Sequence, residues 1–184
     1  MKKIIVFLAA VFACLAVFAQ KTTEIPEAPY LPIDERTNLV TYQDVVKQEG
    51  TPKVLYDRAM DWVKKYYKNT GEVIKSADPE KCVINMRSSV RIFYKDKDGT
   101  MRFKNIVYYN FKLECRDNRY RYTITDFKEK ATGSAPIEAW FNTSASGWTP
   151  SMYGYLSQID EEMQKLIESL EEGMQPKEEF IDEW

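Results

Sequence analysis

Regular alternation of apolar and polar residues marks residues 82–95 as a β-strand. The even positions are mostly apolar: Cys82, Ile84, Met86, Ser88, Val90, Ile92 and Tyr94. The odd positions carry most of the polar and charged side chains, including Arg87 and Arg91. A period of two places successive side chains on opposite faces, so the pattern predicts a strand with one buried face.

Two short turns predict that this strand opens a meander of three antiparallel strands. Asp98-Gly99 suits a two-residue type I′ turn, because Gly adopts positive φ without strain. That turn sets the predicted pairs: Ile84 with Leu113, Met86 with Phe111, Val90 with Val107, and Tyr94 with Phe103. A second turn at Asp117-Asn118 predicts further pairs: Cys115 with Tyr120, Leu113 with Tyr122, and Phe111 with Ile124. Apolar residues thus mostly oppose apolar ones, although a bulge would shift the register part-way.

Helical spacing is found on both sides of the meander. Thr51-Pro52 predicts an N-cap followed by proline at the first helical position, and Gly71 suits the left-handed residue that ends a helix. The apolar positions between them recur at Leu55, Ala59, Val63 and Tyr66. A second helix is predicted from Ser151 to about Gly173, with an apolar stripe on one side and acidic residues on the other.

These elements predict one α+β domain. Residues 38–48 and 72–76 supply two further strands, which gives a β-α-β4-α order and a five-stranded antiparallel sheet. Because each helix has a single apolar stripe, both are expected to pack on one face of the sheet. The tryptophans of residues 128–150, Trp140 and Trp148, are expected to cover an edge or end of the core.

The order of elements resembles one repeat of the TATA-binding-protein-like (TBP-like) fold. Residues 39–46, 57–64, 120–127 and 159–170 are similar to a family of secreted proteins from bacteria of the Bacteroides group. That family is known only as a domain of unknown function with a TBP-like fold. The resemblance spans residues 37–172 and implies a fold and an exported location. It implies no catalytic or binding residue, and the fold name alone does not imply DNA binding.

The N-terminus has the pattern of a secretory signal peptide over residues 1–19. Lys2-Lys3 precedes an unbroken apolar run, and cleavage is expected before Gln20. Lipid attachment at Cys14 is the alternative. The protein is therefore expected to be exported, either periplasmic or secreted. Residues 20–37 are expected to form an extended, proline-containing leader, residues 38–173 the domain, and residues 174–184 an acidic tail.

Cys82 and Cys115 are the cysteines that remain after residue 19. The predicted register places them opposite each other at a non-hydrogen-bonded position, where Cα atoms lie roughly 4.5 Å apart. That spacing and an oxidising compartment favour a disulfide. The alternative is two buried thiols that act as small apolar side chains.

Residues suited to catalysis are scarce in this sequence. It contains no histidine, which removes the commonest general base and metal ligand. Acidic pairs such as Glu161-Glu162 are expected on a solvated helix side, and Asp126 is expected on the inward face opposite Tyr109 as a hydrogen-bonded edge carboxylate. No metal-binding or phosphate-binding motif appears, so neither a metal nor another cofactor is expected.

The outward side of the meander is predicted to be a basic surface with aromatic neighbours. Its predicted binding residues are Arg87, Arg91, Phe93, Lys104, Tyr108, Lys112 and Arg121. Acidic residues concentrate elsewhere, since residues 160–184 hold ten acids and two lysines. A solvated face is one interpretation. The other is a platform for an anionic glycan, a lipid surface or an acidic protein, with nucleic acid not expected.

The sequence therefore favours an exported, non-catalytic binding or accessory module of the cell envelope. One alternative is a small-molecule carrier with a pocket between helices and sheet, lined by Met86, Phe111, Tyr122, Tyr66 and Met163. A carboxylate-dependent hydrolase is a weaker alternative, because histidine is absent.

Overall fold

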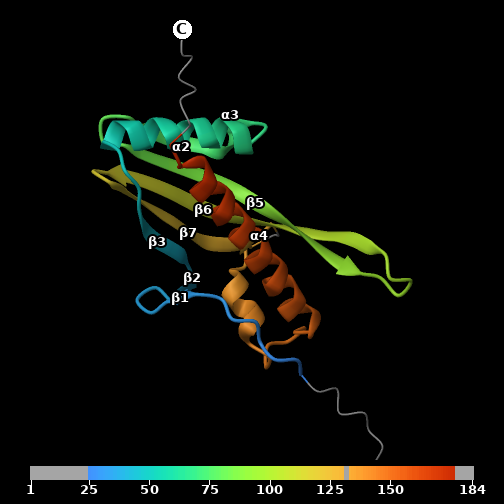
Figure 1. Ribbon diagram of the computed structural model, residues 1–184. Helices are drawn as coiled ribbons and strands as arrows, with labels where there is room; N and C mark the ends of the chain where they lie inside the picture. The colour runs from blue at the N-terminus through green and yellow to red at the C-terminus, as the bar shows by residue number, and fades with distance from the viewer. Residues whose placement is uncertain (1–24, 131–132, 177–184) are drawn as a thin grey trace, which may run out of the picture.

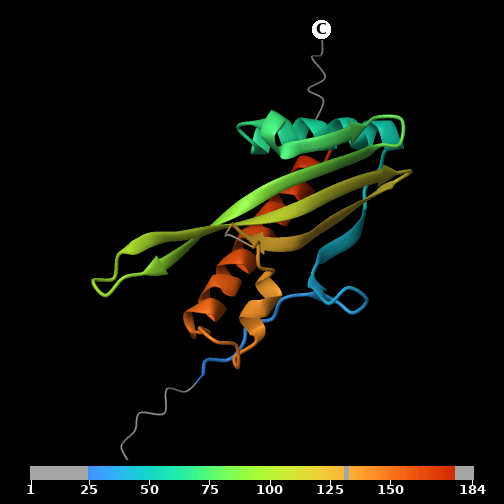
Figure 2. The ribbon, with the colours of Figure 1, turned by 180° about the vertical axis from the view of Figure 1, so that it is seen from behind.

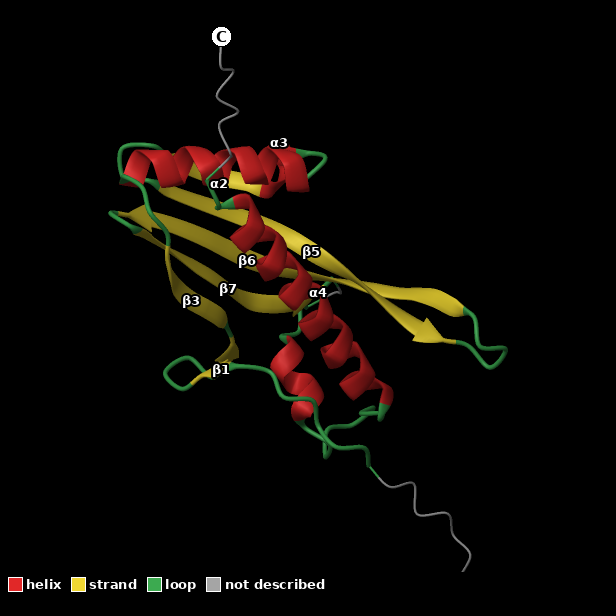
Figure 3. Cartoon of the chain, viewed as in Figure 1, coloured by secondary structure: helices red, strands yellow, loops and turns green. Residues whose placement is uncertain are grey.

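The computed structural model describes residues 25–130 and 133–176. Its main sheet has five antiparallel strands in the order β3-β7-β6-β5-β4. The strands are β3 Tyr42–Lys47, β4 Ile74–Asp78, β5 Val83–Lys95, β6 Met101–Arg116 and β7 Arg119–Glu129. The helices are α2 Pro52–Tyr66, α3 Thr70–Val73, the 3-10 helix η2 Ile137–Phe141 and α4 Ser151–Gly173. Both long helices lie on the same side of the sheet (Figures 1 and 3), which confirms the predicted fold class.

Helix α2 begins as its sequence predicts and ends earlier. The Thr51 side chain accepts a hydrogen bond from the Val54 N–H at 3.3 Å, and Pro52 follows it. The helix ends at Tyr66, because Tyr67 adopts an extended conformation and its ring contacts Trp62, with ring centroids 6.1 Å apart. The prediction that Gly71 ends this helix was wrong, since Gly71 lies in the separate helix α3.

The predicted hairpin register is confirmed from Val83 to Ile92 of β5. Beyond Ile92 a β-bulge intervenes, because Ile92 pairs with Asn105 while Phe93 pairs with Phe103, leaving Lys104 as the extra residue. The predicted pair of Tyr94 with Phe103 was therefore wrong. Phe103 joins Phe93 on the face away from the helices, with ring centroids 6.2 Å apart.

A second bulge changes the position of Asp126. The register between β6 and β7 shifts between Tyr108 and Asn110, and Asp126 has a φ of 60°. Phe127 therefore takes the inward place, where its ring lies 5.6 Å from that of Tyr109. The prediction that Asp126 faces inward opposite Tyr109 was wrong. Its carboxylate instead accepts a hydrogen bond from the Asn110 amide at 3.0 Å and pairs with Lys128 at 2.7 Å.

The core lies between the helices and the inner face of the sheet. Phe111, Leu113 and Leu156 are each at most 1% exposed. The helices approach each other closely, because the Trp62 indole N–H donates to the Ser169 hydroxyl at 3.1 Å and the Trp62 ring lies against Gly173. This packing brings two segments more than 100 residues apart into one layer.

The residues predicted for a carrier pocket belong to this core or lie outside it. Met86, Phe111, Tyr122 and Met163 are each at most 7% exposed and form part of one apolar cluster. Tyr66 is 41% exposed and stacks on Trp62 at the surface. The five side chains therefore do not line a common pocket.

Segments flanking the sheet complete the core. Leu31, from the proline-containing leader, is buried, and the short strands β1 (Ile33–Asp34) and β2 (Leu39–Val40) pair with each other. Met174 is buried beyond the end of α4. Trp140 is buried in η2, and the Trp148 indole N–H donates to its carbonyl at 2.8 Å. The tryptophans thus cover one end of the core, beside α4.

Cys82 and Cys115 are both buried, and both are free thiols. The Cys115 N–H donates to the Cys82 carbonyl at 2.9 Å, so the pair occupies a hydrogen-bonded position and not the predicted non-hydrogen-bonded one. The loop explains the error, because the Asp96 N–H donates to the Thr100 carbonyl at 2.8 Å and the hairpin therefore closes at Asp96 and not at Lys97. The predicted two-residue turn at Asp98-Gly99 was wrong, and the hydrogen-bonded positions of β5 move by one residue. Cys82 also has a φ of 53°, and its thiol donates to the Pro79 carbonyl at 3.4 Å. No disulfide joins the two thiols in this structure, which has the arrangement of the alternative, two buried thiols.

Several predictions concern residues outside the described ranges. They are the signal peptide, its cleavage before Gln20, the alternative of lipid attachment at Cys14, and the part of the acidic tail after residue 176. Within residues 25–130 and 133–176, no helix is long and apolar enough to cross a membrane.

Candidate functional site

The face of the sheet opposite the helices, here called the outer face, carries the predicted binding residues except Lys104. Figure 2 shows this face turned toward the viewer, with α4 behind the strands. The segment after β7 lies on the other side, because Trp140 contacts Tyr155 and Trp148 contacts Tyr153 of α4. Among the described residues, this segment therefore leaves the outer face uncovered.

The β5 side of the outer face combines arginines with aromatic rings. The Arg87 guanidinium lies 5.1 Å from the centre of the Tyr108 ring. The Arg91 guanidinium lies 5.4 Å from the Phe93 ring and 5.3 Å from the Phe103 ring. Within the described chain, neither guanidinium forms an ion pair. We call these five residues the arginine–aromatic strip, in which ring faces hold the cations in place by cation–π attraction.

The β6–β7 side of the outer face also carries cationic side chains, but these are paired with a carboxylate. Glu114 lies between Lys112 and Arg121, with ion pairs of 3.0 Å and 2.6 Å. Burial raises the pKa of the Glu114 carboxyl, but hydrogen bonds from the two cations outweigh burial and lower the pKa overall. Two of the predicted binding cations are therefore already paired with an acid of the same chain.

Lys104 does not join the other predicted binding residues. The bulge turns it toward the helix side, where it lines a hollow of about 100 Å³ with Asn105, Trp140, Met152 and Tyr155. The predicted surface is thus divided into the arginine–aromatic strip, the Glu114 pairs and a separate Lys104.

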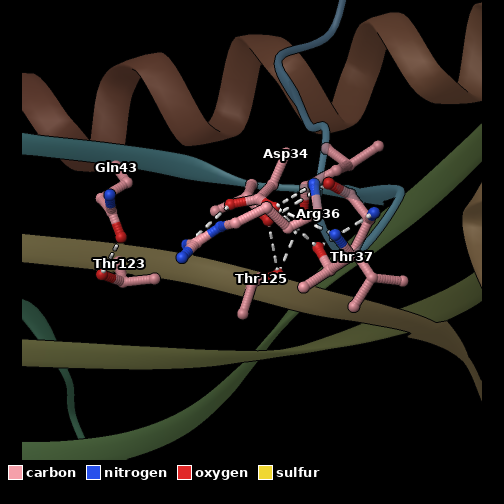
Figure 4. Close-up of polar contacts among 9 residues, drawn as sticks. Asp34, Arg36, Thr37, Gln43, Thr123 and Thr125 are labelled. Atoms are coloured by element: carbon pink, nitrogen blue, oxygen red, sulfur yellow. Dashed lines mark hydrogen bonds and ion pairs between the residues drawn. The ribbon is translucent and has the colours of Figure 1, made fainter.

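Neutral polar side chains occupy the middle and far edge of the outer face. A hollow of about 340 Å³ over the central strands is lined by the neutral polar residues Asn85, Asn110, Thr123 and Thr125, by Lys75 and Lys112, and by Met86 and Phe111, whose side chains are buried in the core. Toward β3, the Thr123 hydroxyl donates to the Gln43 amide oxygen at 3.1 Å, and the Thr125 and Thr41 hydroxyls lie 2.8 Å apart (Figure 4). These neutral groups hydrogen-bond to one another. The guanidinium groups of the arginine–aromatic strip have no acidic partner in the described chain, so the strip is the better site for an anion.

The edge of β5 is held by a contact that sequence reasoning missed. The Gln158 amide of α4 accepts from the Phe93 N–H at 2.9 Å and donates to the Phe93 carbonyl at 2.9 Å. Phe103 was also missed as an outer-face residue, because its place depends on the bulge. A single glutamine on an amphipathic helix gives no sequence signal for such a contact.

Acidic groups on the described elements do not gather into a metal site. No cluster of three or more His, Cys, Asp or Glu side chains with suitable placement occurs in the described ranges. Glu161 and Glu162 are exposed on α4, and Glu162 pairs with Lys165 at 2.9 Å.

Comparison with known proteins supports the fold. Residues 42–130 match the family model described as a domain of unknown function (DUF4468) with TBP-like fold. A DUF4468 family protein from Bacteroides ovatus has a crystal structure similar to this chain, with a TM-score of 0.63 and 11% identity over 80% of this chain and 91% of that one. A TBP-like protein from Parabacteroides distasonis gives a TM-score of 0.59 and 20% identity over 80% and 99%. Among curated proteins, none matches. The DUF4468 similarity extends to the fold and assigns no site.

Proposed function

We propose that this protein is an exported, non-enzymatic binding module whose arginine–aromatic strip docks an anionic partner. The observation that carries the proposal is the setting of Arg87 and Arg91. Both lie over aromatic rings, and neither has an acidic partner within the described chain. A ring orients a guanidinium without neutralising it, so its N–H donors stay available to a carboxylate, sulfate or phosphate.

The energetics favour a partner with several negative charges. An exposed ion pair contributes only about 0–1 kcal/mol, so two arginines hold a single small anion weakly. An extended anion contacts both arginines and the rings between them, and salt screens such contacts. Acidic glycans, anionic lipid headgroups and acidic protein segments have this chemistry and occur in the cell envelope.

The test is charge reversal on the strip. An Arg87→Glu, Arg91→Glu variant is compared with Lys64→Glu, Lys65→Glu, which makes the same charge change on exposed residues of α2. The probes are polygalacturonate, vesicles containing phosphatidylglycerol, and an acidic peptide, each at low and high salt. We expect the strip variant to bind at least one probe about tenfold more weakly than the α2 variant does. Equal binding by the two variants contradicts the proposal.

Export is the second part of this proposal, and it rests on the pattern of residues 1–19. The intact mass of the protein recovered from the cell envelope is expected to correspond to a chain that begins at Gln20. A diacylglycerol adduct on Cys14 contradicts cleavage at that position and identifies a lipoprotein.

A further inference from the structure

More than half of strand β5 has a neighbouring strand on only one side. The edge strand β4 pairs with β5 from Val83 to Met86, and the strand continues to Lys95 without it. The hairpin of β5 and β6 extends beyond the other strands in Figures 1 and 2. The hydrogen bond between Cys115 and Cys82 shows that even-numbered residues of β5 face β6. The backbone groups of odd-numbered residues, Ser89 and Arg91 among them, therefore point away from the sheet.

The Gln158 contact shows what this edge binds. An amide carries one carbonyl and one N–H in the plane of a peptide group, and the Gln158 side chain bonds both backbone groups of Phe93. It takes the place of one residue of an adjacent strand. Two and four residues earlier, Arg91 and Ser89 present the same pair of groups, and no residue of the described chain bonds them.

A hollow and several charged side chains lie beside these unpaired backbone groups. A hollow of about 380 Å³ is lined by Ser89, Val90, Arg91, Phe93, Gln158, Glu161 and Glu162. Arg87 and Arg91 project on the outer-face side of this edge, whereas Glu161 and Glu162 project from α4 on the other side. A strand placed here has its alternate side chains directed to a basic side and an acidic side.

We propose that this edge binds an extended peptide segment by β-strand addition, with acidic residues facing Arg87 and Arg91 and a basic residue facing Glu161. The partner is a protein segment whose charges alternate in sign along the chain. Main-chain hydrogen bonds supply affinity in this mode, and alternate side chains supply specificity. The inference rests on the proposed function, since it names the anionic partner of the strip.

A second copy of this chain fits the edge poorly in the arrangement that is symmetric about Ser89. Two β5 strands related by two-fold symmetry about Ser89 pair antiparallel, which places Arg87 of one chain opposite Arg91 of the other. Like charges directly opposite destabilise a cross-strand pair. A peptide with glutamate at those positions instead forms opposite-charge pairs.

The first test uses synthetic peptides of about ten residues, the length of a long strand. One peptide alternates glutamate with valine and lysine, and its control has the same residues with the glutamates in one block. We expect the alternating peptide to bind the full exported chain roughly tenfold more tightly. Equal affinity of the two peptides overturns strand addition.

Backbone methylation of the alternating peptide tests the hydrogen bonds without changing the protein. One version carries N-methyl groups at its odd-numbered residues, and the other carries them at its even-numbered residues. A strand directs every second N–H toward its neighbour, so one version is expected to lose binding and the other to retain it. Strand addition is excluded if both versions bind like the parent peptide, or if both lose binding.

A protein variant separates strand addition from the proposed function. Ser89→Pro removes an N–H that takes no part in the ladder, and Val45→Pro is its control on the opposite edge, where the Val45 N–H bonds to the Asp44 carboxylate. We expect Ser89→Pro alone to lose the alternating peptide while it keeps any polygalacturonate or vesicle binding of the parent chain. Peptide binding unchanged by Ser89→Pro overturns this inference and leaves the proposed function standing. Concentration-dependent dimerisation that Ser89→Pro abolishes also overturns it, in favour of a second copy.

Discussion

The two faces of strand β6 are built from alternating residues of one stretch, and different forces govern them. On the inner face Phe111 is 1% exposed and meets Trp62 edge to face, with centroids 6.0 Å apart. On the outer face Tyr108 is half-buried beneath Arg87. On the inner face, side-chain volume limits which substitutions are tolerated, because a close-packed interior cannot fill the space left by a lost ring. On the outer face, charge and contact with a partner limit the substitutions, because neighbouring side chains can move.

The largest expected difference between the faces comes from removing one ring from each. Phe111→Ala is expected to lower the free energy of unfolding by about 3–5 kcal/mol, because it leaves a cavity in the core. Tyr108→Ala is expected to lower it by about 1 kcal/mol or less, the value of an exposed cation–π contact. Urea unfolding followed by circular dichroism measures both. Similar losses in the two variants contradict the assignment of the faces.

A smaller effect is expected where the two helices meet on the inner side. A Cβ atom at Gly173 falls 2.8 Å from Cγ of the Trp62 ring, so Gly173→Ala forces the helices apart. The expected cost is about 1–3 kcal/mol in the free energy of unfolding.

Gly154, also in α4, supplies the control. No atom lies within 4 Å of a Cβ built there, and alanine favours a helix over glycine by about 0.5–1 kcal/mol. Gly154→Ala is therefore expected to raise the thermal midpoint and Gly173→Ala to lower it. Midpoints that shift in the same direction disprove the close approach at Trp62.

The smallest effect belongs to the outer face and depends on pH. Because the folded pKa of Glu114 is lowered, its ionised form stabilises the fold above its unfolded pKa. That stabilisation is lost as the pH falls through the folded pKa. Glu114→Gln is expected to cost about 1 kcal/mol or less at neutral pH and to match the parent chain in acid. Unfolding midpoints measured from neutral to acidic pH give the comparison, and a gap that widens in acid rules out the pairing.

Much of the fold could be predicted because its signals are local. The alternation of β5 and a count from Asp98-Gly99 paired Ile84 with Leu113 and Met86 with Phe111 correctly. The loop, which closes at Asp96 and Thr100, is one residue longer than predicted, and the bulge at Lys104 offsets that difference. Thr51-Pro52 placed the start of α2 for a similar reason, since a cap needs only its own helix.

The candidate site was harder to predict, because bulges depend on tertiary packing. Lys104 and Asp126 were placed by counting from the turns, and each lies at an irregularity that the count cannot include. The bulges move Phe103 to the outer face and Phe127 to the inner face. The Glu114–Arg121 pair follows from the register that the turn at Asp117-Asn118 sets, whereas the Gln158 contact does not, since it requires the distance between a helix and a strand edge.

The Gln158 contact also has a consequence for the order in which the newly made chain acquires its structure. Hairpin contacts between β5 and β6 are local and form early, whereas Gln158 follows Phe93 by 65 residues. As the chain folds, the meander therefore forms before α4 is in place to hold its edge. In that interval the outward-facing backbone groups of Ser89, Arg91 and Phe93 have no internal partner, and an open edge pairs readily with other strands. Arg87 and Arg91, which lie along that edge, limit such pairing between nascent copies through charge repulsion.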